Sequence, residues 1–372
     1  MQTKYEVAQV LDLLADKVED IGLNKWQLRT LSAIKICRTA ELGGHIDACD
    51  SCGNITISYN SCRNRHCPKC QGHKREQWIE KIGRDLLPVP YFHVVFTLPD
   101  TLNTLALHSP KLVYDTLFAA SWQTINQFGI NKNVQMGMIS ILHTWGQTLG
   151  LHPHLHCIVP GGGVDKSGNW HNIRADGQFL FCAKALGKVF RAKFVSILNK
   201  SIELDKIFRE KLFEKPWVVY AKRPFGSPKS VVEYLGRYTH KIAISNHRIK
   251  SIDKNTVTFG YKDYKKNGEK KVMTLSHKEF VRRFSQHILP KRFVKIRHYG
   301  FLSSTWKKLK FKILQDKFNI IPIPKEEKVK EKLNKCPCCK TGNLIMIEVF
   351  GKRGPPRSSA LGDSQTLVPH KK

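Results

Sequence analysis

The feature that most restricts the fold of this chain is a pair of Cys-x-x-Cys motifs near the N-terminus. Cys49 and Cys52 form the first pair, Cys67 and Cys70 form the second, and fourteen residues separate them. Residues 55–59 between the pairs have the composition of a β-strand. Because each motif can supply two thiolates to a tetrahedral ion, the spacing predicts a zinc ribbon with these four cysteines as the ligands of structural Zn²⁺.

Other potential ligands nearby leave two alternatives open. Cys62 and His66 could replace one member of the predicted set, and Cys37 with His45 could belong to a second site. The chain has 11 cysteines, most of them close to another cysteine or a histidine. This clustering is more typical of metal binding in a reducing cytosol than of a disulfide framework.

A second candidate metal site lies in the segment 152–160, which reads as a β-strand that stops at a Gly-rich turn. In a strand, alternate side chains share a face, so His154 and His156 point the same way. Two imidazoles on one face can form half of a metal site. Gln147 could bring a side-chain oxygen to the metal, with His152 as the rival third ligand. The simpler alternative is an exposed histidine pair on a half-buried strand.

The charge of the chain points to a polyanionic partner. The formal net charge is +32, and residues 221–310 hold 23 Lys and Arg against 5 Asp and Glu in a region that also carries aromatic residues. Basic residues interleaved with aromatic residues suit a groove for single-stranded nucleic acid. The expected DNA-binding side chains are basic residues beside the cysteine motifs and in the C-terminal half: Arg63, Arg65, Arg237, Lys291, Arg292, Lys295 and Arg297.

The sequence shows neither a membrane-spanning segment nor a secretory signal. No stretch reaches about 18 uninterrupted apolar residues, and the N-terminus lacks the pattern of a secretory signal. We therefore expect a cytoplasmic protein with no membrane partner, associated with the nucleoid when it is bound to DNA.

Residues 228–241 read as a helix that carries two tyrosines on one face. Tyr234 and Tyr238 are four residues apart, and Lys241 lies one turn beyond Tyr238. The alternative is a pair of core tyrosines. Gly236 argues against this alternative, because a glycine inside a helix costs about 1 kcal/mol and often marks the close approach of another backbone.

These motifs together resemble a known family. His154-Leu-His156 resembles the histidine motif of the HUH endonucleases, Phe96-Thr-Leu-Pro99 is similar to their first motif, and Tyr238-Thr-His-Lys241 is similar to the third. With the cysteine motifs and the segment 287–299, the chain resembles the two-tyrosine, rolling-circle transposases of the insertion sequence 91 family. The resemblance covers roughly residues 10–310.

The expected fold is α+β, and the resemblance implies an antiparallel sheet flanked by helices. Expected helices span 4–20, 24–37, 109–129, 183–203 and 228–241, and expected strands span 55–59, 91–99, 136–147, 152–160, 216–222, 256–262 and 270–275. The expected domains are N-terminal helices (1–36), a zinc ribbon (37–87), a nuclease core (88–250), a basic DNA-binding extension (251–312) and a C-terminal segment (313–372). That last segment contains a lone cysteine motif, Cys336 to Cys339, whose other half is not visible nearby, and a tail from about 352 that we expect to be disordered.

By resemblance, the protein nicks a DNA strand at the ends of a mobile element through tyrosine attack. The 5′-phosphotyrosine conserves the energy of the broken bond, so the strand can be transferred without ATP. Mg²⁺ or Mn²⁺ would be the catalytic ion, with Tyr238 as the first nucleophile, Tyr234 as the second and Lys241 beside them. The alternatives are a rolling-circle replication initiator or relaxase, a nucleotide hydrolase of the histidine-triad kind, and a catalytically inactive zinc-dependent DNA-binding protein.

Overall fold

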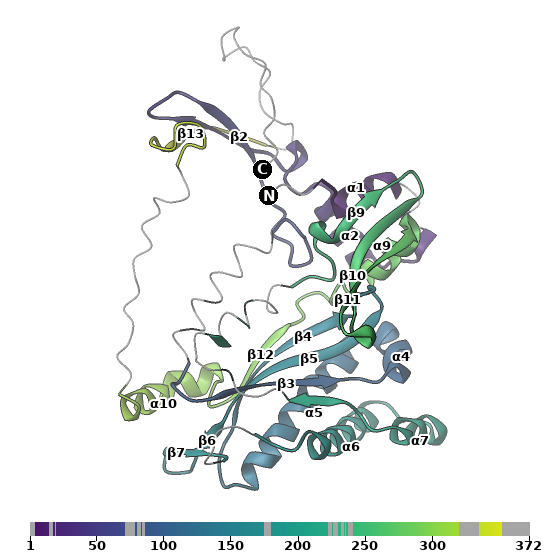
Figure 1. Cartoon of the computed structure of the whole chain (residues 1–372), viewed down its shortest axis with the longest axis vertical. Helices are drawn as coiled ribbons and strands as arrows, with labels where there is room; N and C mark the ends of the chain where they lie inside the picture. The colour runs from purple at the N-terminus through teal and green to yellow at the C-terminus, as the bar shows by residue number, and fades with distance from the viewer. Residues whose placement is uncertain are drawn as a thin grey trace. The chain divides into compact units, whose positions relative to one another are not determined.

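The computed structural model describes residues 4–14, 18, 20–70, 79, 83, 86–174, 180–221, 225, 230–231, 234, 236, 241–319 and 335–351. The chain divides into two compact units, and the elements of both are labelled in Figure 1. Unit 1 contains residues 1–72, 244–285 and 324–372, and unit 2 contains residues 73–243 and 286–323. Each unit is therefore assembled from segments that are far apart in the sequence.

Unit 2 is built on a five-stranded antiparallel sheet with the strand order β12-β4-β5-β3-β8. Its strands are β3 (Tyr91–Thr97), β4 (Gly137–Trp145), β5 (Leu151–Pro160), β8 (Val219–Ala221) and β12 (Ile296–Gly300). A two-stranded ribbon of β6 (Gly162–Val164) and β7 (Trp170–Asn172) follows β5. The helices of unit 2 are α4 (Asn103–His108), α5 (Pro110–Ile130), α6 (Ala183–Ser201), α7 (Lys206–Glu214) and α10 (Ser304–Lys317).

One face of this sheet packs against α5 and α6, which lie side by side in Figure 1. Leu155, Cys157 and Val159 of β5 are fully buried in this core, together with Phe190 and Phe194 of α6. Burial of each such side chain contributes about 1.5–3 kcal/mol. Since residues alternate along β5, the same packing directs His154 and His156 to the opposite face.

The opposite face of the sheet is covered along only part of its length. There, Ile158 of β5 belongs to a second core with Ile139 and Ile141 of β4 and with Phe311 and Leu314 of α10. The histidines of β5 lie on the same face as Ile158, toward the other end of the strand. On this face, apolar packing therefore holds the C-terminal end of β5, and the histidines lie toward its N-terminal end.

Unit 1 combines helices with two three-stranded antiparallel sheets, in the orders β13-β1-β2 and β11-β10-β9. Asn24 forms a capping box with Gln27 at the start of its second helix. The elements of unit 1 are α1 (Val7–Leu14), α2 (Lys25–Lys35), β1 (Gly44–Cys49), β2 (Ile55–Tyr59), β9 (Ile249–Ile252), β10 (Thr256–Asp263), β11 (Glu269–Ser276), α9 (His277–Ser285) and β13 (Leu344–Phe350). Short 3₁₀ helices span Ala40–Leu42, Asn246–Arg248, Tyr264–Lys266 and, in unit 2, Asp100–Leu102.

The expected α+β class and the antiparallel sheet are confirmed. The expected order of five consecutive domains differs from the observed units, because the basic extension is divided between them. Residues 244–285 contribute the β9–β11 sheet and α9 to unit 1, whereas β12 joins the edge of the main sheet in unit 2. The expected helix over 228–241 lies mostly outside the described residues, and the tail from 352 lies entirely outside them.

Candidate metal centres and active site

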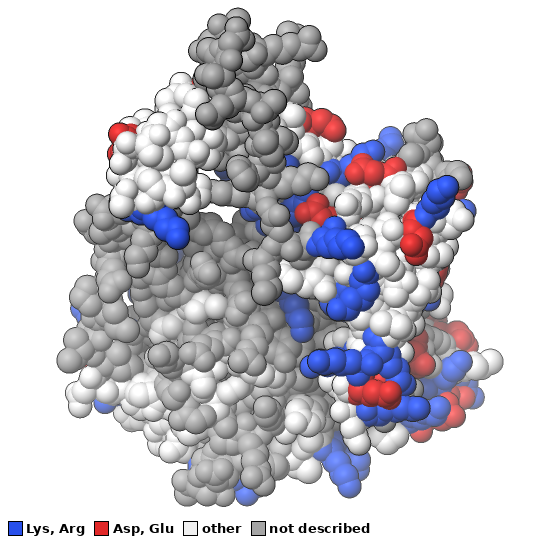
Figure 2. All heavy atoms as spheres, turned by 45° about the horizontal axis from the view of Figure 1, so that its top comes forward, with Lys and Arg blue, Asp and Glu red and all other residues white. Residues whose placement is uncertain are grey.

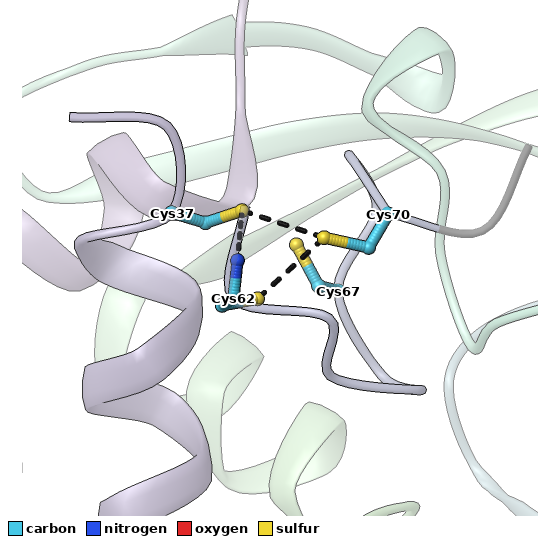
Figure 3. A group of neighbouring side chains, drawn as sticks. All are labelled: Cys37, Cys62, Cys67 and Cys70. Carbon is cyan, nitrogen blue, oxygen red and sulfur yellow. Dashed lines mark hydrogen bonds between the residues drawn. The ribbon is translucent and has the colours of Figure 1, made fainter. Parts of the chain in front are cut away.

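Four cysteines of unit 1 form a first cluster, shown in Figure 3, where their thiols point toward a common centre. Cys37 follows the C-terminus of α2, and Cys62, Cys67 and Cys70 lie in the segment after β2. The Sγ of Cys70 lies 3.5 Å from that of Cys37 and 3.6 Å from that of Cys62. Backbone N–H groups also donate to these sulfurs, as from Cys62 to Cys37 at 3.4 Å.

A second cluster contains cysteines from two segments that are far apart in the sequence. Cys49 and Cys52 lie at the turn between β1 and β2, and Cys336 and Cys339 precede β13. The Sγ atoms of Cys49 and Cys339 are 3.7 Å apart, as are those of Cys52 and Cys336. Pairing of β13 with β1 brings these segments together, and Cys49 itself lies opposite Leu344 in this ladder.

The expected single ribbon site is corrected by this arrangement. Cys49 and Cys52 belong to one cluster, whereas Cys67 and Cys70 belong to the other. Cys62 and Cys37, which the sequence left as alternatives, complete the first cluster, and neither group includes His45 or His66. The lone motif near the C-terminus supplies the two ligands that the first motif lacks.

Both clusters fit zinc. A Zn–S bond of about 2.3 Å in a tetrahedron places neighbouring sulfurs about 3.8 Å apart, close to the observed separations and far from a disulfide bond. The N–H···S bonds favour thiolates over thiols. The pKa of Cys37 is lowered to about 7, chiefly by its side-chain hydrogen bond with Cys62, and that of Cys339 is lowered to about 6, chiefly by Thr341, whereas the hydrogen bond with Cys37 raises the pKa values of Cys62 and Cys67.

Three histidines of unit 2 form the other candidate metal centre. His143 of β4 lies directly opposite His154 of β5, and His156 follows two residues later on the same face. Each offers a ring nitrogen within 4.8 Å of the others. Within the described part of the chain, no carboxylate joins this group, so a divalent cation held here would keep its full positive charge and attract phosphate.

Hydrogen bonds orient two of these rings. His154 donates its Nδ1–H to the carbonyl oxygen of His152 at 2.6 Å, and Nδ1 of His156 lies 2.9 Å from Nε2 of the buried His93 on β3. Both rings can therefore direct Nε2 toward a metal. A ligating histidine is commonly oriented in this way, by a hydrogen bond to its other ring nitrogen. Desolvation lowers the pKa of His154 to about 4 and that of His156 far below its ordinary value, so both rings are neutral near pH 7.

His143 was missed by sequence reasoning, although its position at the end of a predicted strand beside the histidine strand was a usable signal. His152 is exposed and does not belong to the histidine group; its carbonyl oxygen instead orients His154. Gln147 lies in the turn beyond β4, and its role as a ligand stays a prediction.

A tyrosine reaches this centre through His93. The Tyr234 hydroxyl lies 3.1 Å from Nδ1 of His93, and the ring centroids are 5.0 Å apart. Tyr238 and Arg237 lie outside the described residues. Lys241 is exposed, and its carbonyl oxygen accepts a hydrogen bond from Lys295 Nζ at 2.9 Å.

Comparisons with known proteins relate both the N-terminal and the central part of this chain to transposases. A family model described as a transposase zinc-binding domain matches residues 10–98, and one described as a putative transposase matches residues 137–310. The putative transposase y4qJ of Sinorhizobium fredii is 40% identical over 378 residues, which cover 92% of this chain and 94% of that protein. The chain belongs to the insertion sequence 91 family of transposases.

A second relative of this transposase is the transposase for insertion sequence element IS801 of Pseudomonas savastanoi pv. phaseolicola. It is 29% identical over 303 residues, which cover 78% of this chain and 73% of the relative. No solved structure matches the chain. The family implies a DNA-processing enzyme that binds DNA and a domain that holds structural zinc. Among the described helices, none is long and apolar enough to cross a lipid bilayer.

The basic residues expected to bind DNA differ in their surroundings. Figure 2 shows that Lys and Arg cover more of the visible face of the transposase than Asp and Glu. Arg63, Lys291 and Arg292 are exposed. Arg297, in contrast, forms an ion pair with Asp115, and its guanidinium lies 4.1 Å from the Phe118 ring centroid. Arg297 therefore contributes to packing between β12 and α5.

Two further basic residues lie beside the candidate metal centres. Lys295 lies 5.2 Å from the ring centroid of Trp145, which stacks on His143 at 4.7 Å. Arg65 is half-buried beside the first cysteine cluster, and burial lowers its pKa. Four thiolates around Zn²⁺ carry a net charge of −2, which a nearby cation such as Arg65 would partly offset.

Proposed function

We propose that this transposase cleaves single-stranded DNA at the ends of its element by tyrosine attack and transfers the strand through a 5′-phosphotyrosine intermediate. The observation that supports this most is the linkage of Tyr234 through His93 to a cluster of three histidines. A nucleophile, a basic surrounding and ligands for a divalent cation thus lie in one part of unit 2.

The chemistry balances without an energy source. The phenolic oxygen of the tyrosine bonds to the scissile phosphorus, the bond from phosphorus to the 3′ oxygen breaks, and the tyrosine proton passes to solvent as the 3′ oxygen gains one. In the transfer step, the 3′ hydroxyl of another strand attacks the phosphotyrosine and releases the tyrosine. The phosphodiester count is unchanged, so no ATP is required.

The residues of the chain supply positioning and charge. His143, His154 and His156 would hold Mg²⁺ or Mn²⁺, which when bound polarises a phosphate oxygen and neutralises developing charge. Lys241 and Lys295 add positive charge close to the histidines, where a DNA phosphate would lie. Since an ordinary tyrosine has a pKa of about 10, attack near pH 7 depends on this electrostatic support.

A covalent-adduct assay tests the proposal. The purified transposase is mixed with labelled single-stranded DNA from its element ends and Mn²⁺ or Mg²⁺, then run on a denaturing gel beside Tyr234→Phe, Tyr238→Phe and the double variant. Tyr264→Phe is the matched control, because Tyr264 is exposed and lies in unit 1. We expect a metal-dependent adduct that the control retains and the double variant loses.

The assay also separates the alternatives. DNA binding without an adduct on an authentic end sequence would favour a catalytically inactive DNA-binding protein. An adduct formed equally well on double-stranded ends would contradict the proposed preference for single strands. Movement of a flanked DNA segment would distinguish transposition from the initiation of replication.

A further inference from the structure

Both ring nitrogens of His93 are engaged between a candidate metal ligand and a candidate nucleophile. His93 is buried on β3, with its Nε2 2.9 Å from Nδ1 of His156 and its Nδ1 3.1 Å from the Tyr234 hydroxyl. In the strand pairing, His156 lies opposite Val95, so His93 is its diagonal neighbour on the same sheet face. The rings of His93 and His156 are nearly parallel, at 11°.

A neutral imidazole has one N–H and one lone pair, so protons along this row can take only two consistent arrangements. In the first, His156 Nδ1–H donates to His93, and His93 Nδ1–H donates to the Tyr234 oxygen. In the second, the Tyr234 hydroxyl donates to His93, and His93 Nε2–H donates to His156. The first arrangement leaves a lone pair on His156 Nε2, whereas the second leaves a proton there.

A cation can bind His156 Nε2 only in the first arrangement, because a ligating nitrogen must offer its lone pair. In that arrangement the Tyr234 oxygen accepts a hydrogen bond from His93. Such a bond stabilises negative charge on the phenolic oxygen. It also requires the hydroxyl proton of Tyr234 to point away from His93. Cation binding at His156 and the orientation of the Tyr234 hydroxyl are thus two ends of one hydrogen-bond row.

We propose that His93 is a positioning residue that couples cation binding by the histidine cluster to the presentation of Tyr234 as the attacking tyrosine. The inference rests on the proposed cleavage reaction and favours Tyr234 over the sequence-based choice of Tyr238. His93 touches neither phosphate nor cation in this scheme. It acts by fixing which nitrogen of His156 carries the proton and which direction the Tyr234 hydroxyl takes.

Three substitutions separate the two contacts of His93. The amide of His93→Gln can replace Nε2 and accept from His156, whereas the amide of His93→Asn can replace only Nδ1 and reach Tyr234. His93→Phe removes both contacts. His108→Asn serves as the control, because His108 is exposed on α4 and hydrogen-bonds to Thr104 of its own helix.

The first measurement is the affinity for Mn²⁺ in the absence of DNA, determined by electron paramagnetic resonance. We expect the Kd to rise about 10–100-fold in His93→Phe and His93→Asn, the usual effect of losing an outer partner of a ligating histidine. His93→Gln and the control should stay within a few-fold of the wild type. Thermal unfolding and zinc content identify any variant that fails to fold.

The second measurement maps the adduct by peptide mass spectrometry at saturating Mn²⁺. We expect most wild-type adduct on Tyr234, with this share reduced in His93→Gln and His93→Phe and kept in His93→Asn. Wild-type Mn²⁺ affinity in all three variants, or adduct mainly on Tyr238 in the wild type, would overturn the inference. Absence of any wild-type adduct would instead count against the proposed function, while the Mn²⁺ measurement would still report on the contact with His156.

Discussion

The cysteine clusters and the histidine cluster differ in how completely the chain surrounds a metal. Each cysteine cluster supplies four thiolates, which complete a tetrahedron and leave no position for a substrate. The histidine cluster supplies three imidazole nitrogens and no carboxylate among the described residues, which leaves open positions and the full charge of a divalent cation. The first arrangement suits a structural role, and the second suits chemistry on a phosphate.

The largest effect on stability is expected from opening the first cysteine cluster. Cys62→Ser should remove one zinc ion and lower the free energy of unfolding by at least about 3 kcal/mol, since zinc binding by four thiolates is coupled to folding. Zinc content and thermal unfolding measure this effect. Cys182→Ser is the control, because Cys182 is exposed outside both clusters. Unchanged zinc content in Cys62→Ser would contradict the assignment of this cluster.

Removing a ligand from the histidine cluster should weaken cation binding. We expect His143→Ala to raise the Kd for Mn²⁺ by at least about 100-fold, beyond the usual effect of losing an outer partner. Gln147→Ala is the matched comparison, because it tests the ligand predicted from sequence. Equal losses in both variants would add Gln147 to the site, and a loss only in Gln147→Ala would reverse the assignment.

The sequence predicted the local parts of these centres better than their assembly. The motifs identified Cys49, Cys52, Cys67 and Cys70 individually, and strand alternation placed His154 and His156 on one face. Neither kind of pattern reveals which strand becomes the neighbour of another. His143 became visible only when β4 paired with β5, and Cys336 and Cys339 found partners only when β13 paired with β1.

Long-range pairing also explains the differences in the fold. The expected strands did not include residues 296–300, yet β12 begins at Ile296 in unit 2, after α9 has ended at Ser285 in unit 1. The alternation of Ile296, His298 and Gly300 with Arg297 and Tyr299 is short and partly polar. Its strand character depends on pairing with β4, which local periodicity does not record.

Opening the second cysteine cluster should have a smaller effect on stability, because its C-terminal half holds only a short segment onto β1. We expect Cys339→Ser to lower zinc content from two ions per chain to one and to make the segment 335–351 more sensitive to proteolysis. Cys338→Ser is a close control, since Cys338 lies in the same motif, is exposed and belongs to neither cluster. Equal zinc loss in both variants would point to damage of the motif as a whole.

The smallest effect concerns His287, a buried histidine that supports the histidine cluster without joining it. Nδ1 of His287 lies 3.1 Å from Thr144 Oγ1, beside His143. Its Nε2–H donates at 3.0 Å to the carbonyl oxygen of Leu149, a residue with a φ of 62°. His287 thus links β4 to the strained turn that leads into β5.

Burial lowers the pKa of His287 from 6.5 to about 4, so the unfolded chain binds more protons than the folded chain between these values. The stabilisation is therefore complete above about pH 6.5 and is lost as the pH falls toward 4, by at most about 1.4 kcal/mol per pH unit. His287→Gln keeps a donor for Leu149 but does not titrate. Urea unfolding at pH 7 and pH 5 should show a smaller loss of stability in this variant than in the wild type. Equal losses in the two proteins would assign the acid sensitivity to other groups, the metal ligands first among them.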